Sequence, residues 1–404
     1  MPSPFENLAR TMPGTIVRVK MFFICSISQL SYPMGNLDYS NNRDLAGNLV
    51  VREARKGRGA ASNRAGRYER HAGEACDDGW GSLEEPLDKL QTVVQADHSR
   101  TAITRNASPD LGFDRSINAY RGCEHGCAYC FARPTHAFLG LSPGQDFESK
   151  IFAKHDAPAQ LARELSNPRY RCRMIAIGTN TDPYQPTERR LEITRGILSV
   201  LSQYEHPVGI VTKSALVTRD IDILESMARR NLVKVVLSIT TLDSELARRL
   251  EPRAATPAKR LSAIRALSEA GIPTGVNFAP VIPALNESEL EGVLEAAAAA
   301  GAREAGYILL RLPLEIKELF EEWLRLHVPK RANHVMNRIR DMHAGQLYRA
   351  GFGVRQTGSG PSAELLAQRF RLAKKRYGLN NPALRLDTSR FCPPLKQGDQ
   401  LTLL

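Results

Sequence analysis

Short apolar runs alternate with amphipathic stretches through the middle of the sequence, and this alternation constrains the fold more than any other feature. The strand-like runs are often β-branched and lie at residues 117–120, 174–177, 208–211, 233–239, 274–278 and 306–310. The helix-like stretches between them cover residues 157–165, 191–204, 219–230, 258–270 and 287–300. Alternation of this length predicts right-handed βαβ units and a parallel sheet, so the fold class is α/β with six such units.

The end of the chain has a different pattern. After Pro313 the sequence becomes helical and charged, over residues 314–327, 334–343 and 364–377. We therefore expect a barrel-like domain at residues 115–313 and a helical C-terminal extension at 314–404. The last of these helices carries a basic face, which is either a guide for an anionic substrate or simply a solvated surface.

The beginning of the chain is basic and irregular. Residues 51–114 form a basic N-terminal extension, and residues 52–70 carry seven basic side chains against two acidic ones. Such an arm either binds phosphate backbones or is a flexible, solvated segment. Residues 71–114 show weak periodicity, which is typical of an irregular covering segment. Residues 1–50 show none, and we expect them to be disordered or to reflect a gene start placed too far upstream.

Three cysteines stand close together after the first strand-like run. Cys123, Cys127 and Cys130 have C-x3-C-x2-C spacing, and Gly122 and Gly126 favour a loop over a helix. Three thiolates at this spacing can hold three corners of an iron–sulfur cubane and leave one iron open to another ligand. This loop is therefore the candidate metal site.

Two other kinds of metal site could use the same loop. A Cys3His zinc site formed with His125 or His136 is the main alternative, although zinc sites usually use two separated cysteine pairs. A ferredoxin-type cluster needs a fourth cysteine, and Cys76, Cys172 and Cys392 lie far away in the sequence. We expect these three to be ordinary buried thiols.

Composition and charge point to a polyanion as partner. The formal net charge is +12 and the isoelectric point is near 9.5, so nucleic acid is the favoured substrate. The seven cysteines without disulfide-like spacing suit a reducing cytoplasm, where we place the protein. The apolar run at residues 21–28 is far shorter than the ~20 residues that span a bilayer, so no membrane partner is expected.

Several motifs beyond the cysteines resemble one known family. Tyr129 precedes the third cysteine, and three further motifs follow later strand-like runs: Gly178-Thr-Asn-Thr-Asp-Pro-Tyr-Gln-Pro186, Thr212-Lys213-Ser214 and Pro280-Val-Ile-Pro283. Together with the cysteine triplet they resemble the radical S-adenosylmethionine (SAM) superfamily. Within it, residues 52–394 are most similar to the spore photoproduct lyase-like branch and to an uncharacterised bacterial group of that branch. The resemblance implies a partial (βα)6 TIM-type barrel with its site at the carboxyl ends of the strands.

The resemblance also implies cofactors and residue roles. The cofactors are a [4Fe–4S] cluster on the three cysteines and SAM, with an external electron donor such as a flavodoxin or ferredoxin. Tyr129 would lie along the adenine, unless it is only a packed aromatic. Five further positions would contact SAM: Gly178, Thr179, Thr181 and Asp182 around its ammonium group, and Lys213 at its carboxylate.

Three more positions complete the expected site. Ser238 would contact the ribose or carboxylate of SAM, and Asn277 and Arg311 are weaker candidates. The alternative for Asp182 is a structural Asx turn before Pro183. No catalytic residue is assigned. In spore photoproduct lyases a cysteine that returns hydrogen to the product stands where this chain has Thr179, which puts that repair reaction in doubt.

The resulting hypothesis is a radical SAM enzyme that abstracts hydrogen from DNA, RNA or another anionic substrate in a lyase-like repair or modification reaction. Two alternatives remain at this point. One is a nucleic-acid-binding module with a structural metal, and the other is a radical SAM enzyme that acts on a protein or a small molecule.

Overall fold

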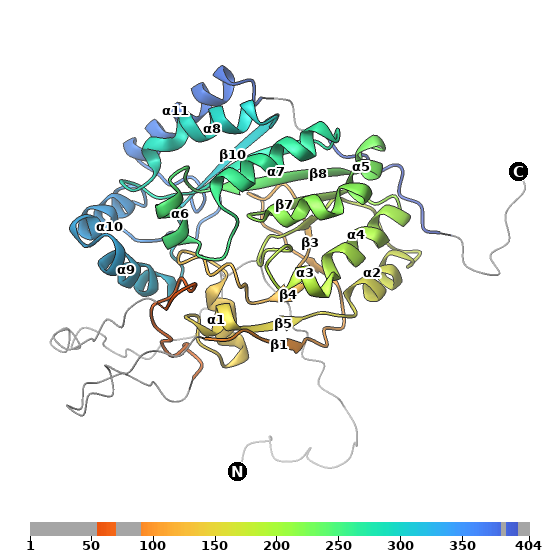
Figure 1. The fold of residues 1–404 in the computed structure, drawn as a ribbon, viewed down its shortest axis with the longest axis horizontal. Helices are drawn as coiled ribbons and strands as arrows, with labels where there is room; N and C mark the ends of the chain where they lie inside the picture. The colour runs from red at the N-terminus through yellow and green to blue at the C-terminus, as the bar shows by residue number, and fades with distance from the viewer. Residues whose placement is uncertain (1–54, 70–89, 381–384, 395–404) are drawn as a thin grey trace, which may run out of the picture.

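A seven-stranded sheet forms the centre of the computed structural model, which describes residues 55–69, 90–380 and 385–394 (Figure 1). The strand order is β10-β9-β8-β7-β6-β3-β2, and every pair except β2 with β3 is parallel. The six parallel strands are β3 (Arg115–Ile117), β6 (Ile175–Ile177), β7 (Val208–Thr212), β8 (Val233–Ile239), β9 (Thr274–Val281) and β10 (Glu304–Leu309). The sheet does not close on itself, which confirms the expected partial barrel.

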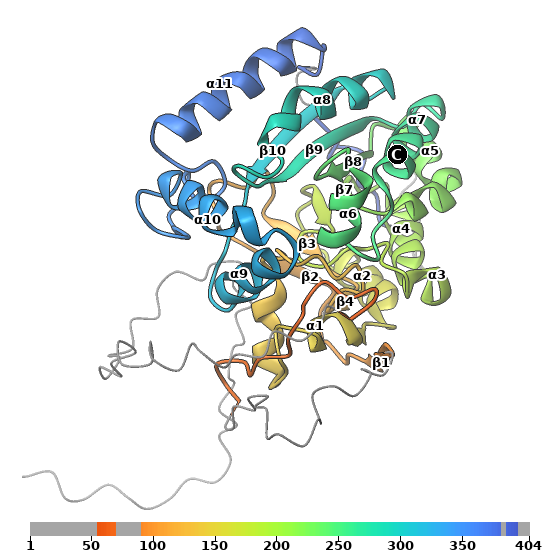
Figure 2. The same cartoon turned by 60° about the vertical axis from the view of Figure 1, so that its left-hand side comes forward.

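Helices follow the strands as the alternation predicted. They are α2 (Ala157–Leu165), α4 (Ile193–Gln203), α5 (Ile221–Arg229), α7 (Pro257–Glu269) and α8 (Leu290–Ala299). Figure 2 shows α4, α5 and α7 on one side of the strands and α9 and α10 on the other. The start of α7 has a local cause, because Thr256 accepts a hydrogen bond from Lys259 N–H and Pro257 fits the first helical turn.

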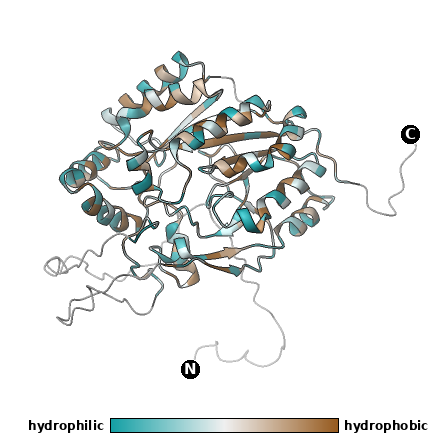
Figure 3. Cartoon of the chain, viewed as in Figure 1, coloured by the Kyte–Doolittle hydropathy of each residue, from teal (hydrophilic) through white to brown (hydrophobic). Residues whose placement is uncertain are grey.

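The two faces of the sheet differ in what they bury. In β8, Val233, Val235, Leu237 and Ile239 are fully buried against the helices, and this face carries the largest core cluster. The intervening residues, such as Lys234 and Val236, point to the inner side of the partial barrel and are only half-buried. Figure 3 shows the same division, with the apolar sides of the helices turned toward the strands. The inner side is therefore left for polar groups.

The C-terminal region is helical, as expected. It contains α9 (Ile316–His327), α10 (Ala332–Asp341) and α11 (Pro361–Arg376). The basic helix α11 packs on α8, and Arg369 pairs with Glu291 at 2.6 Å. Phe370 of the same helix packs against Tyr307 of β10, with ring centroids 4.7 Å apart and the ring planes tilted by 53°. The helix therefore belongs to the outer layer of the molecule.

The segment before the barrel is more regular than predicted. The expectation of an irregular segment at 71–114 is wrong for its described part, where β1 (Val93–Ala96) and β2 (Ile103–Arg105) form strands. β1 joins β5 (Lys150–Ala153) and β4 (Tyr120–Arg121) in a second, three-stranded sheet. These strands are only two to four residues long, and such short strands give no periodicity in a sequence.

Both edges of the main sheet are covered within the described residues. β2 runs antiparallel along β3 at one edge. At the other edge, Leu309 N–H donates to the carbonyl oxygen of Gln356 at 2.7 Å, and Glu304 forms an isolated bridge with Asn380. No helix in the described ranges is both long enough and apolar enough to cross a bilayer. Residues 1–50 lie outside the described residues.

A buried histidine connects the C-terminal tail to the amino ends of the strands. His206 is fully buried, and its Nδ1 lies 3.0 Å from the carbonyl oxygen of Pro207 while its Nε2 lies 2.8 Å from the Tyr170 hydroxyl. Because a carbonyl oxygen only accepts, Nδ1 carries the hydrogen and Nε2 accepts from Tyr170. Burial lowers the pKa of His206 to about 4.

The free energy of unfolding should therefore fall as the pH is lowered from neutrality to about 4. Below about pH 6.5 His206 becomes protonated in the unfolded chain but stays neutral in the folded chain. The free energy of unfolding therefore falls by on the order of 3 kcal/mol for this one residue. Urea unfolding across this range measures it. His206→Gln cannot take up the proton, so its dependence should be shallower, and equal slopes for variant and wild type would contradict the prediction.

Candidate metal centre and cofactor site

The three cysteines lie on one loop at the carboxyl side of the strands. We call residues 122–132 the cysteine loop; it connects β4 to the 3₁₀ helix η2 (Arg133–Leu139). Cys123 and Cys127 are buried and Cys130 is half-buried. Gly122 and Gly126 have φ values of 77° and 66°, a left-handed backbone that glycine adopts readily. The prediction of a loop rather than a helix is confirmed.

The surroundings of the sulfurs suit thiolates that are bound to metal. Burial raises the pKa of Cys123, Cys127 and Cys130, so each thiol is protonated unless a cation stabilises the thiolate. Against that trend, the backbone N–H of Asp182 lowers the pKa of Cys123, and those of Ala132 and Arg133 lower the pKa of Cys130. Amide donors of this kind stabilise cluster thiolates and tune the reduction potential of a cluster.

Two other potential metal ligands near the loop have charged neighbours. Glu124 pairs with Arg253 at 3.1 Å, and His125 Nδ1 lies 3.4 Å from Asp182 Oδ2. Among the described residues, no three His, Cys, Asp or Glu side chains converge closely enough to hold one metal ion. Tetrahedral zinc, with Zn–S bonds of about 2.3 Å, would need such convergence. Three thiols that each bind a different iron do not, so the loop fits a cluster better than the Cys3His zinc site.

A buried carboxylate next to the loop organises its polar neighbours. Glu251 is 2% exposed and accepts hydrogen bonds from the Tyr129 hydroxyl, from Thr240 Oγ1 at 2.6 Å and from Arg260 Nη2. Lys213 Nζ lies 3.9 Å from the same carboxylate and 5.7 Å from the centre of the Tyr129 ring. The network therefore joins the cysteine loop to the end of β7.

The charge state of this network follows from its partners. Burial alone would raise the pKa of Glu251, but the charges of Arg260 and Lys213 and two hydroxyl donors hold it at about 2. Glu251 is thus ionised at neutral pH and balances the two cations. Sequence reasoning missed Glu251 and Arg260, and nothing in their local pattern distinguishes them from exposed charges.

Asp182 lies beside the cysteine loop, but its carboxylate is already occupied by the protein. Oδ1 accepts from Tyr184 N–H at 2.9 Å and from Thr212 Oγ1 at 2.7 Å, while Oδ2 accepts from Lys213 N–H at 2.7 Å. The bond to Tyr184 N–H is the Asx turn that was the structural alternative. Asp182 thus fastens the turn after β6 to the end of β7. Its contact with the ammonium group of SAM stays a prediction.

The remaining predicted positions lie on or near the same turn. Gly178 has φ 87°, and a Cβ there would be 2.0 Å from the carbonyl oxygen of Val211, so no other residue fits. Thr181 is buried and donates to the carbonyl oxygen of Tyr120 at 2.9 Å, while Thr179 is half-buried. Ser238 lies on the inner side of β8, next to Asn277 of β9 in register. Their contacts with SAM also stay predictions.

Arg311 has a place near the loop that its sequence did not reveal. It follows β10, and its guanidinium carbon lies 4.5 Å from the ring centre of Phe131, the residue after the third cysteine. Its Nε is buried and has no hydrogen-bond partner in the described chain. The stack occupies the face of the guanidinium and leaves its N–H edge for another group.

Cys172, Cys392 and Tyr307 lie apart from this site. Cys172 is half-buried and Cys392 is exposed, so the expectation of buried thiols is wrong for both; Cys76 lies outside the described residues. The backbone N–H of Cys392 donates to Tyr204, which precedes β7 and so marks the amino ends of the strands. Tyr307 packs on α11 on the outer side of the sheet.

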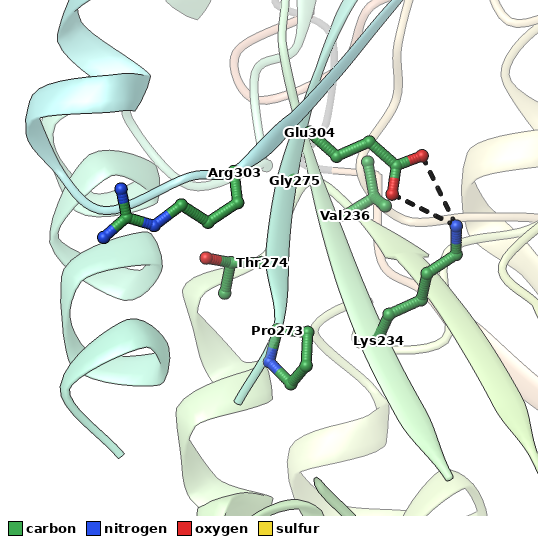
Figure 4. Close-up of a pocket in the computed structure, with 7 residues that line it drawn as sticks. All are labelled: Lys234, Val236, Pro273, Thr274, Gly275, Arg303 and Glu304. Atoms are coloured by element: carbon green, nitrogen blue, oxygen red, sulfur yellow. Dashed lines mark hydrogen bonds and ion pairs between the residues drawn. The ribbon is translucent and has the colours of Figure 1, made fainter. Parts of the chain in front are cut away.

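A small pocket opens at the opposite end of the sheet. Figure 4 shows its lining at the start of β8, β9 and β10, where Lys234 Nζ pairs with Glu304 at 3.2 Å. The lining contains none of the predicted site residues. Chemistry in parallel barrels occurs at the carboxyl ends of the strands. We therefore infer that the Lys234–Glu304 pair, at the amino ends, has a structural role.

Comparisons with known proteins agree with this geometry. The model of the Radical SAM superfamily matches residues 117–297. Uncharacterised proteins of Mycobacterium tuberculosis and Mycobacterium bovis are 38% identical over 235 residues, which is 58% of this chain and 68% of theirs. A mutant of spore photoproduct lyase superposes with a TM-score of 0.51 and 17% identity, over 71% of this chain and 80% of that one. Another mutant of that enzyme, solved with bound AdoMet and dinucleoside spore photoproduct, superposes with a TM-score of 0.50 and 16% identity. The superposition covers 71% of this chain and 79% of that one.

Proposed function

Because this chain belongs to the radical SAM superfamily, we propose that it is an enzyme that holds a [4Fe–4S] cluster on Cys123, Cys127 and Cys130 and uses SAM to abstract hydrogen from an anionic substrate. The observation that carries the proposal is the set of three thiols on one loop at the carboxyl side of the strands, two of them buried and one half-buried. When bound, the cluster supplies an electron that cleaves SAM to methionine and a 5′-deoxyadenosyl radical.

The protein's own residues bind and orient SAM in this proposal. Lys213 is held by Glu251 at the end of β7, where a cation can receive the SAM carboxylate. Its backbone N–H is fixed by Asp182, so the position of Lys213 depends on the turn after β6. We assign the ammonium group of SAM to this turn and its ribose to the inner side of β8 near Ser238.

We further infer that the substrate is DNA or RNA. The net charge of +12 favours a polyanion. Arg311 supports the same choice, because a stacked guanidinium with a free N–H edge suits a phosphate beside the cysteine loop. We do not propose repair of spore photoproduct itself, because Thr179 has a hydroxyl, which donates hydrogen atoms poorly, at the position where that branch uses a thiol. We place the enzyme in the cytoplasm, with a flavodoxin or ferredoxin as electron donor.

The test is anaerobic reconstitution with iron and sulfide, followed by dithionite and SAM, and measurement of 5′-deoxyadenosine. We expect release that rises with DNA or RNA and not with cell protein fractions. Loaded protein that releases none would overturn the enzyme class, and about one zinc without sulfide would favour the structural-metal module. Stimulation by protein or small-molecule fractions alone would overturn the substrate class only.

Nucleic-acid binding should also respond to salt and to Arg311. Each neutralised phosphate contributes a slope of roughly −0.7 to −0.9 in log affinity against log salt. Arg311→Gln should weaken oligonucleotide binding more than Arg371→Gln on α11. Equal effects of the two variants would argue against a phosphate site beside the cysteine loop.

A further inference from the structure

A segment before the barrel lies directly on the cysteine loop. We call residues 55–69 the strap. A Cβ on Gly59 would lie 1.7 Å from the carbonyl oxygen of Gly126, so the strap backbone touches the loop backbone with no room for a side chain. Ala60 and Ala61 are buried at the same place. The strap lies outside the residues that the superfamily model matches, so the family alone does not account for it.

A buried carboxylate joins the strap to the loop. Glu148 is fully buried, and it accepts Gly59 N–H at 3.0 Å and Ala60 N–H at 2.8 Å. The same carboxylate pairs with Arg133, which is also fully buried. A buried carboxylate is stable only with such partners, so the strap supplies two of the donors that Glu148 requires.

Arg133 carries the connection to a cysteine. Its Nε donates to the carbonyl oxygen of Cys127 at 2.9 Å, and its Nη1 donates to the carbonyl oxygen of Gly144 at 2.8 Å. Its own backbone N–H donates to the carbonyl oxygen of Cys130 at 3.1 Å. Strap, Glu148, Arg133 and cysteines therefore form one continuous chain of hydrogen bonds.

The outer end of the strap is fastened to α9 and its flank. Ser62 Oγ donates to Glu322 at 2.6 Å, and Arg67 pairs with Glu315 at 2.8 Å. Arg58, the neighbour of Gly59 in the strap, is buried and donates to the carbonyl oxygen of Glu148 at 2.7 Å. In the described part of this basic segment, Arg58 and Arg67 contact other parts of the chain and help to hold the strap in place. Phosphate binding by residues 52–70 stays a prediction.

We propose that the strap covers the outer side of the cysteine loop and retains the metal cluster there, with Glu148 and Arg133 as positioning residues. This inference rests on the proposed cluster. Residues that support metal ligands from behind typically change metal affinity by about 10- to 100-fold when they are replaced. Displacing the strap should therefore loosen the cluster even though the three cysteines remain.

The test is the rate at which reconstituted full-length protein loses iron to a chelator without oxygen, followed by visible absorbance. In Gly59→Val the new side chain meets the Gly126 carbonyl, and we expect loss about tenfold faster than in wild type. Gly112→Val is the matched control, because a Cβ at Gly112 meets nothing within 4 Å. Leu294→Ala, in the core away from the strap, controls for lower stability. Iron loss in Gly59→Val must be faster than in this variant.

A second variant tests the proposal if Gly59→Val folds poorly. Glu315→Ala with Glu322→Ala removes two of the contacts at the outer end of the strap and should speed iron loss in the same direction. Unchanged loss in both strap variants, or loss no faster than in Leu294→Ala, would overturn the strap proposal and leave the enzyme class standing. Wild-type protein that takes up no cluster would instead overturn the proposed function.

Discussion

Cys127→Ala is expected to remove the iron–sulfur cluster and all release of 5′-deoxyadenosine while the protein stays folded. Cys127 is buried in the middle of the cysteine loop, and two remaining thiolates cannot hold a cubane at three corners. The backbone contact of this residue survives, because Arg133 binds its carbonyl oxygen and not its side chain. Iron and sulfide content together with product release measure the effect.

Cys172→Ala serves as the control for this experiment. Cys172 is a half-buried thiol, and its surroundings contain Arg115 and Asp387 rather than the cysteine loop. Iron, sulfide and product should equal those of wild type. A Cys127→Ala protein with a full complement of cluster would mean that a different set of ligands binds the metal.

Glu251→Gln is expected to lower the free energy of unfolding by about 3–5 kcal/mol, because it leaves Arg260 buried without a charged partner. Tyr129 and Lys213 lose the same anchor, so the affinity for SAM should also fall. Urea unfolding measures the first effect without any cofactor. SAM binding to the reconstituted protein measures the second.

The matched control is Glu245→Gln on α6 (Ser244–Leu250). Glu245 pairs with Arg249, but its side chain is 72% exposed, and exposed pairs contribute about 0–1 kcal/mol. The pH dependence adds a second criterion. The folded pKa of Glu251 is about 2, below that of an ordinary carboxyl, so its contribution is present above about pH 4.5 and is lost as the pH falls toward 2. A loss as small as that of the control would mean that Glu251 is not the anchor described above.

The parallel sheet could be predicted because its strands are buried on the helix side and retain apolar residues there. β8 can be recognised in the sequence because apolar residues stand at every second position, namely Val233, Val235, Leu237 and Ile239. β1 and β5 could not be found in the same way, because they lie outside the strand–helix alternation by which even the three-residue β6 was predicted, and β1 is mostly exposed.

The site divides along a similar line. The cysteine triplet and the turn at Gly178 are local patterns, and the sequence displays them directly. Glu148, Glu251 and Arg260 depend on which distant segments enclose them, and burial is a property of the tertiary structure. The contacts of the strap could not be predicted for the same reason, since a basic segment has the same sequence pattern whether its arginines face water or contact other parts of the chain.

The covered edges of the main sheet bear on how the protein behaves in concentrated solution. An exposed strand offers a row of unused amide groups on which a second molecule can polymerise. Here β2 occupies one border, and the segments that contain Gln356 and Asn380 lie along the other. An open sheet in an incomplete cylinder leaves two borders, and in the described chain these flanking segments pair with part of each.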